Sequence, residues 1–220
     1  MVIENYMPDF AVEAVYDLTV PSLQAQGIKA VLVDLDNTLI AWNNPDGTPE
    51  MKQWLHDLRD AGIRIIVVSN NTKKRVQRAV EKFGIDYVYW ALKPFTFGID
   101  RAMKEFHYEK SEVVMVGDQL MTDIRAAHRA GIRSILVNPL VQHDSIKTQI
   151  NRARERRVMR KITEKYGPIT YKKGISGFHH LFLSLLSQKS PVSVAKATET
   201  FTTVGNIFLA SLRLASYLSS

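Results

Sequence analysis

The sequence predicts an α/β protein with a doubly wound, Rossmann-like parallel sheet. Over residues 28–138, short apolar runs rich in β-branched residues alternate with segments that have the apolar spacing of amphipathic helices. This alternation indicates βαβ units, whose crossovers are right-handed. The runs are apolar throughout, which is typical of parallel strands covered on both faces. Ligands of such sheets bind beyond the carboxyl ends of the strands, so we looked for polar residues there.

The predicted elements follow one another with short connections. The predicted strands cover residues 28–35, 63–68, 87–90, 113–116 and 134–138. The predicted helices cover residues 48–61, 72–83, 96–107 and 121–130. Thr48 is a suitable N-cap for the first of these helices and Pro49 suits its first turn. Glycines at positions 62, 84 and 131 are expected to end helices.

Three regions are expected along the chain. Residues 1–27 form an amphipathic helical preface with a second helical turn after Pro21, and residues 28–175 form the sheet domain. Residues 176–220 are a C-terminal extension rich in Ser, Thr, Leu and Ala. The start of the chain lacks the basic region of a secretory signal peptide, and no apolar run is long enough for a membrane-spanning helix. The absence of cysteine excludes disulfides and thiolate chemistry.

The chain is basic, with a formal net charge of +7, which indicates an anionic partner. Much of this charge lies in a predicted helix over residues 144–166. Its basic residues are Arg152, Arg154, Arg156, Arg157, Arg160, Lys161 and Lys165. Such a run is either a solvated helix face or a surface for lipid headgroups. RNA binding is less favoured, because no aromatic residues are interleaved with the charges.

Polar residues follow four of the predicted strands. In chain order they are Asp34 and Asp36, Ser69 and Asn70, Lys93, and Asp118 and Asp123. These residue types suit phosphoryl transfer, which needs a nucleophile, charge neutralisation and a proton donor. A carboxylate can attack phosphorus and form an acyl phosphate, and Mg²⁺ prefers a few carboxylates together with water and substrate oxygens. A hydroxyl and a lysine can hold the transferring group.

These residues and their neighbours resemble the four ordered motifs of the haloacid dehalogenase (HAD) phosphatases. The matching motifs are Asp34-Leu35-Asp36-Asn37-Thr38, Ser69-Asn70, Lys93-Pro94 and Gly117-Asp118-Gln119 with Asp123. The resemblance extends over residues 29–139. It implies the HAD fold, a Mg²⁺ cofactor and a phosphorylated substrate.

The resemblance also implies a role for each motif residue. Asp34 is the expected nucleophile and a metal ligand. Asp36 is the expected general acid and base, and its backbone carbonyl also binds the metal. Ser69, Asn70 and Lys93 are expected to bind the phosphoryl group. Asp118 is a further metal ligand. For Asp123 three roles stay open: it holds a metal-bound water, it orients the loop, or it is a helix N-terminal carboxylate.

The short connections between the motifs indicate which subgroup of the HAD phosphatases the chain resembles. Only residues 40–47 separate the first motif from the next helix, and a single helix separates the second motif from the third, so neither gap fits a cap domain. An open site favours a large or surface-bound substrate. The residues of the first and fourth motifs resemble those of HAD subclass IIIA. The residues leading into the first motif resemble the YqeG-type family. That family is similar to the mitochondrial phosphatidylglycerophosphate phosphatases.

The resemblance therefore implies an enzyme that removes the terminal phosphate of phosphatidylglycerophosphate in phospholipid biosynthesis. We expect a cytoplasmic protein that associates peripherally with the anionic inner face of the membrane, through its basic helix or its preface. One alternative is a phosphatase that acts on a soluble phosphorylated metabolite. Another is an RNA- or ribosome-associated binding module with a vestigial site, although every motif residue is retained and nucleic acid is an unlikely partner.

Overall fold

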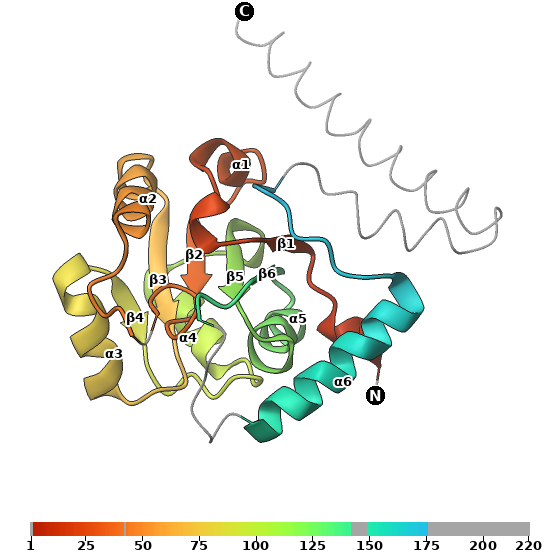
Figure 1. Ribbon diagram of the computed structural model, residues 1–220. Helices are drawn as coiled ribbons and strands as arrows, with labels where there is room; N and C mark the ends of the chain where they lie inside the picture. The colour runs from red at the N-terminus through yellow and green to blue at the C-terminus, as the bar shows by residue number, and fades with distance from the viewer. Residues whose placement is uncertain (1, 42, 142–148, 176–220) are drawn as a thin grey trace, which may run out of the picture. The chain divides into compact units, whose positions relative to one another are not determined.

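The fold is built around one six-stranded parallel sheet in the order β1-β6-β5-β2-β3-β4 (Figure 1). The computed structural model describes residues 2–41, 43–141 and 149–175. The strands are β1 (Phe10–Val12), β2 (Ala30–Val33), β3 (Arg64–Val68), β4 (Asp86–Val88), β5 (Val113–Gly117) and β6 (Arg133–Val137). The predicted doubly wound α/β fold is therefore confirmed.

Strand β2 lies at the point where the strand order reverses. From β2 the chain continues through β3 and β4 on one side, and it returns to the other side for β5 and β6. Val33, the last residue of β2, is in register with Val67 of β3 and Val116 of β5. The residues after Val33 therefore leave the sheet at its switch point, where open α/β sheets bind ligands.

Helices cover both faces of the sheet. They are α1 (Val20–Gln24), α2 (Pro49–Asp60), α3 (Lys73–Val80), α4 (Phe97–Phe106), α5 (Arg125–Ala130) and α6 (Gln149–Tyr166). Val31 and Val33 of β2 belong to the hydrophobic cluster that includes the buried residues of α2 and α3. Ala30 and Leu32 belong to the second cluster, with those of α4 and α5. Successive side chains of a strand point to opposite faces, so α2 and α3 cover one face and α4 and α5 the other.

Local signals predicted the start and the end of α2 correctly. Helix α2 begins as predicted: the hydroxyl of Thr48 accepts a hydrogen bond from the backbone N–H of Met51 at 3.2 Å. Gly62 follows this helix with a φ of 72°, in the left-handed region that favours glycine.

The segment before residue 28 differs from the prediction of an amphipathic helix. Its first part contains 3₁₀ turns at Ile3–Tyr6 and Val15–Asp17, separated by strand β1, and only the helical turn after Pro21 is found, as α1. Val12, Val15 and Leu18 are completely buried in the core. The spacing of these three residues resembles that of a helix. Instead, Val12 is buried in β1, which pairs with β6, and Val15 lies in the 3₁₀ turn that follows. Because these side chains are buried, this segment does not offer an apolar face to a membrane.

The region after β6 is described only in part. Helix α6 carries the predicted basic run and packs onto the rest of the domain through the buried residues Val158 and Ile162. The beginning of the predicted basic helix and the C-terminal extension, residues 142–148 and 176–220, lie outside the described residues. Among the helices that the structure describes, none is both long and apolar enough to cross a membrane.

Candidate active site

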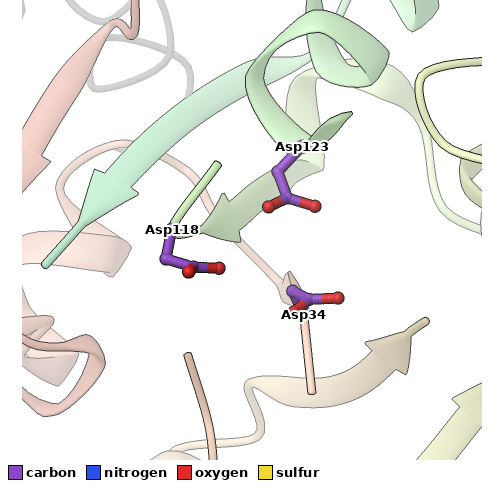
Figure 2. Close-up of side chains that lie close together, drawn as sticks. All are labelled: Asp34, Asp118 and Asp123. Atoms are coloured by element: carbon purple, nitrogen blue, oxygen red, sulfur yellow. The ribbon is translucent and has the colours of Figure 1, made fainter. Parts of the chain in front are cut away.

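Three carboxylates gather at the carboxyl edge of the sheet (Figure 2). Asp34 follows β2 and Asp118 follows β5, while Asp123 lies in the π-helical turn Leu120–Ile124 that precedes α5. One oxygen from each of the three lies within 4.8 Å of the others. The backbone N–H of Asp34 donates to the carbonyl of Val116 at 2.9 Å, which continues the pairing of the two strands into the site. All-oxygen donors at this spacing suit Mg²⁺.

Lys93 joins two of these carboxylates. Its Nζ lies 2.6 Å from Oδ1 of Asp34 and 2.7 Å from Oδ1 of Asp123, and its side chain is 2% exposed. Burial alone would lower the pKa of Lys93, but the charges of Asp123 and Asp34, and the hydrogen bonds to them, raise it above its usual range. The lysine is therefore a fixed positive charge beside Asp34.

The carboxylates that face each other resist ionisation. Burial raises the pKa of Asp34 to about 6, against the opposing effect of the Lys93 charge. Burial and the charges of Asp123 and Asp34 raise the pKa of Asp118 well above its usual range, although the Thr38 hydroxyl donates to Asp118 at 3.1 Å. One lysine does not neutralise three clustered carboxylates. A divalent cation would supply the missing positive charge, so the donor set fits the Mg²⁺ that the motifs imply.

Asn70 holds the turn that carries Lys93. Its side-chain NH₂ donates to the carbonyl of Lys93 at 2.9 Å, and its side-chain carbonyl accepts from the backbone N–H of Lys93 at 2.7 Å. The neighbouring Ser69, at the end of β3, is buried, and its hydroxyl accepts from the backbone and side-chain N–H groups of Asn71, each at 3.2 Å. The second motif thus links β3 to the lysine turn.

Asp36 lies outside the carboxylate cluster. Its two oxygens accept hydrogen bonds from the side chains of Asn71, at 2.5 Å, and Arg75 of α3, at 2.7 Å. The structure therefore separates the two aspartates of the first motif: Asp34 faces Lys93, and Asp36 faces α3. Sequence analysis missed both partners of Asp36. Arg75 had no local signal, because it is one of several basic residues on an amphipathic helix.

Gly117 allows Asp123 to approach the end of β5. A Cβ atom at Gly117 would lie 2.3 Å from the carboxyl carbon of Asp123, far closer than two carbon atoms can come. The carboxylate of Asp123 also accepts from the backbone N–H of Gln119 at 3.2 Å. The glycine of the fourth motif is thus required by the position of Asp123, whose carboxylate contacts both the Gln119 backbone and Lys93.

Glu155 of α6 supports the same turn, and sequence analysis missed it. Its carboxylate accepts from the backbone N–H groups of Leu120 and Met121, the latter at 3.2 Å. Burial raises the pKa of Glu155 to about 7, against the effect of these two donors. The only sequence signal was an acid within a run of arginines. Glu155 thus ties α6 to the segment that carries Asp118 and Asp123.

We expect Glu155→Ala to destabilise the protein. The substitution leaves two backbone N–H groups at the start of a helical segment without their acceptor, which typically costs about 1–3 kcal/mol of unfolding free energy. Urea unfolding followed by circular dichroism measures this loss. Glu164→Ala is the matched control, because Glu164 lies on the same helix with its side chain 65% exposed. An exposed ion pair contributes less than about 1 kcal/mol, so equal losses in both variants would contradict the role of Glu155.

Comparison with known proteins agrees with this geometry. The family model for haloacid dehalogenase-like hydrolases matches residues 5–137. The probable phosphatase YqeG of Bacillus subtilis is 35% identical over 160 residues, which are 73% of this chain and 93% of that protein. A ribulose-1,5-bisphosphate 5-phosphatase of Halopiger xanaduensis is 29% identical over 117 residues, which are 49% of each chain.

Solved structures are more distant. The crystal structure of an uncharacterized protein from Listeria monocytogenes serotype 4b has a TM-score of 0.44 and 22% identity, and the match covers 54% of this chain and 85% of that one. The family match spans the sheet from the amino-terminal turns to β6 and so includes all four motifs. The chain therefore belongs to the haloacid dehalogenase-like hydrolase family, as one of its phosphatases.

Proposed function

We propose that this phosphatase forms an aspartyl-phosphate on Asp34, with Mg²⁺ as cofactor. The observation that carries the proposal is the placement of Asp34 at the switch point of the sheet, between the buried ammonium of Lys93 and the carboxylates of Asp118 and Asp123. Asp34, Asp118 and the backbone carbonyl of Asp36 would hold the ion, which would neutralise charge on the phosphate oxygens.

The reaction has two steps. A carboxylate oxygen of Asp34 attacks phosphorus, the bond to the ester oxygen breaks, and Asp36 gives that oxygen a proton. Asp36 then accepts a proton from a water molecule, which attacks the phosphorus of the acyl phosphate, so that inorganic phosphate leaves and Asp34 is restored. Ser69 and Lys93 bind the phosphoryl oxygens. Asn71 and Arg75 orient Asp36, and Asn70 acts by positioning Lys93.

For the substrate we propose phosphatidylglycerophosphate, which loses its terminal phosphate. Three observations support this choice: the resemblance of the motifs to the YqeG-type family, the basic charge of the chain, and the short connections around the site. Residues 34–48 lead from β2 to α2, and α3 with one 3₁₀ turn leads from β3 to β4. Neither connection has room for a cap domain, and a site without a cap accepts a phosphate at the surface of a large assembly.

A soluble phosphorylated metabolite is the second candidate substrate. It is favoured by the similarity to the Halopiger protein, which is named for a soluble sugar bisphosphate. The third idea, a binding module with a vestigial site, has less support, because the motif residues are present and interact closely.

Phosphate release distinguishes the two substrates. We expect Mg²⁺-dependent release from phosphatidylglycerophosphate in mixed micelles, at a kcat/KM at least about 100-fold above that for ribulose 1,5-bisphosphate, because specificity reflects differential binding of the transition state. The Asp34→Asn variant controls for contaminating phosphatases. Preference for the soluble ester would overturn the lipid assignment and leave the mechanism intact. Failure to release phosphate from either would count against both.

Magnesium binding should strengthen as the pH rises. Burial raises the pKa of Asp34 to about 6 and also raises the pKa of Asp118, so the metal must displace protons in mildly acidic solution. Below the pKa, each displaced proton weakens apparent affinity about tenfold per pH unit. Titration calorimetry should therefore show tighter binding at pH 8 than at pH 5.5. The Asp118→Asn variant should bind Mg²⁺ weakly at both pH values. A wild-type affinity that does not change with pH would contradict Asp34 and Asp118 as metal ligands.

When metal is absent, a rise in pH has an unfavourable effect: ionisation of the same carboxyls lowers the stability of the folded protein. The folded-state pKa of Asp34, about 6, lies above that of the unfolded chain, so this carboxyl lowers the free energy of unfolding as the pH rises from about 4 to 6. The pKa of Asp118 is also raised, so its effect has the same sign. The increase in melting temperature produced by Mg²⁺ should therefore be larger at pH 8 than at pH 5.5.

A further inference from the structure

The segment that connects β4 to the start of α4 (Figure 1) carries most of the large exposed hydrophobic side chains of the described residues. Five large hydrophobic residues are exposed in the described part of the chain, and four of them lie in residues 90–97, which we call the aromatic loop. They are Trp90, Leu92, Phe95 and Phe97, exposed by 60%, 50%, 57% and 65%. The rings of Phe95 and Phe97 are neighbours, with centroids 6.4 Å apart. Clustered apolar exposure of this kind marks an interaction surface.

The backbone of the aromatic loop is held in place. Ala91 is completely buried, its carbonyl accepts from the backbone N–H of Gly98 at 3.0 Å, and its N–H donates to the carbonyl of Ser69 at 3.0 Å. A Cβ atom at Gly98 would lie 2.3 Å from that of Ala91, so the start of α4 packs directly on the loop. The two hydrogen bonds from Asn70 to Lys93 add to this support. The exposed side chains therefore project from a fixed base.

The aromatic loop also carries one residue of the active site, Lys93. Lys93, whose ammonium contacts Asp34, lies in the loop between the exposed residues Leu92 and Phe95. Neighbouring residues thus face opposite ways: Lys93 points into the site, and Leu92 points out to solvent. Whatever covers the exposed side chains therefore lies against the loop that also carries Lys93.

Basic side chains lie beside the aromatic loop and the residue before it. Arg129 of α5 donates to the carbonyl of Pro94 at 2.9 Å, and its guanidinium lies 5.5 Å from the centre of the Phe95 ring. Arg101 and Lys73 lie over the ring of Tyr89, just before the loop, at 5.2 Å and 5.9 Å. Asp100, in the first turn of α4, is an exposed acid in this region. Exposed aromatic residues flanked by basic ones suit the interface of an anionic bilayer.

We propose that the aromatic loop docks on the surface of an anionic lipid bilayer, with Trp90, Phe95 and Phe97 at the level of the headgroups. Docking there would present a phosphate of the bilayer to Asp34. The proposal deepens the proposed lipid function and rests on it, since only a substrate embedded in a bilayer requires such a surface. It also replaces the amino-terminal segment, whose apolar residues are buried, as the site of membrane contact.

Vesicle flotation with the full-length protein tests the proposal. We compare wild type with the triple variant Trp90→Ser, Phe95→Ser and Phe97→Ser on vesicles of phosphatidylglycerol and phosphatidylcholine. Removing three aromatic side chains should lower the partition coefficient at least about tenfold. The control is Val2→Ser, which removes an apolar side chain that is 60% exposed and lies outside the loop. We expect Val2→Ser to bind these vesicles like wild type. Vesicles of phosphatidylcholine alone should bind wild type more weakly than vesicles that contain phosphatidylglycerol.

Two further measurements make the result specific to the aromatic loop. The chain has three tryptophans, so the emission is measured in a Trp42→Phe background, in which Trp54 and Trp90 remain. Binding should shift this emission to shorter wavelength, and addition of Trp90→Phe should largely abolish the shift, because Trp54 is buried. Turnover of a soluble ester, para-nitrophenyl phosphate, should stay within about twofold of wild type in the triple variant, since none of the three side chains acts on the phosphate. This readout shows that the variant is folded.

The outcomes separate this proposal from the proposed function. Equal vesicle binding by the triple variant and wild type, or no binding by wild type, would overturn the docking surface even if phosphatidylglycerophosphate is hydrolysed in micelles. Binding that depends on the aromatic loop without hydrolysis of that lipid would support the surface and reject the substrate. A wild-type dimer that the triple variant converts to monomer, seen by sedimentation velocity without vesicles, would assign the loop to a second copy of the chain and overturn the proposal.

Discussion

Replacement of Asp34 by asparagine is expected to lower kcat at least about 10⁴-fold, because an amide oxygen is a poor nucleophile and cannot form the acyl phosphate. Folding should be affected little. Burial already disfavours the ionised carboxylate, as its pKa of about 6 indicates, and Lys93 keeps Asp123 as a partner. We therefore expect the free energy of unfolding to change by no more than about 1 kcal/mol.

Steady-state phosphate release and urea unfolding measure the two effects separately. Asp46→Asn is the matched control, because Asp46 carries the same carboxylate with its side chain 82% exposed and pairs only with Lys82 among the ion pairs of the described residues. It should keep full activity. Brief reaction of wild type with substrate, followed by borohydride reduction and peptide mapping, should label Asp34. Activity of Asp34→Asn within tenfold of wild type, or a label at another residue, would show that Asp34 is not the nucleophile.

Replacement of Lys93 by methionine is expected to have the largest effect on stability. The substitution keeps the aliphatic part of a side chain that is 2% exposed but leaves Asp34 and Asp123 without their shared cation. Breaking a buried ion pair by removing one partner typically costs about 3–5 kcal/mol, because the remaining charge is buried without compensation. Activity should be lost as well, since the phosphoryl group loses its fixed positive charge.

The stability loss caused by Lys93→Met should depend on pH. Without the Lys93 charge, which lowers the pKa of Asp34, that pKa should rise above its value of about 6, so Asp34 becomes neutral at a higher pH than in wild type. The stability loss in metal-free buffer should therefore be largest near pH 8 and become smaller toward pH 5. Lys82→Met is the control, because Lys82 pairs with the exposed Asp46 at the surface and its loss should cost less than about 1 kcal/mol. A Lys93→Met protein as stable as wild type at pH 8 would refute the buried ion-pair network.

Local sequence signals were sufficient for most of the sheet domain. Continuous β-branched runs predicted β2, β3 and β5, because strands buried on both faces need apolar residues at every position. The cap and proline at Thr48 and Pro49 predicted the start of α2, since they act on the adjacent backbone alone. Strand β1 was not predicted. It has three residues, and its partner β6 lies more than 100 positions further along the chain.

The active-site residues also fall into those that the sequence predicted and those that it did not. Sequence order identified the motif residues, and the structure brings Asp34, Lys93, Asp118 and Asp123 into contact around one point. Asn71 and Arg75 beside Asp36 were not predicted, nor was Glu155 beneath the Asp123 turn. Each of these contacts joins elements that are distant in sequence, so no periodicity or spacing within one element could reveal it.

By itself, the sequence determined the fold class, the order of β2 to β6 along the chain and the chemical type of the site, because these depend on local pattern and on which residues follow each strand. Only the tertiary structure decided which partners hold each carboxylate, and that the amino-terminal segment is core while the loop around Lys93 is exposed. Burial is a property of the packed molecule: Val12 and Trp90 are both apolar, yet one is completely buried and the other is 60% exposed.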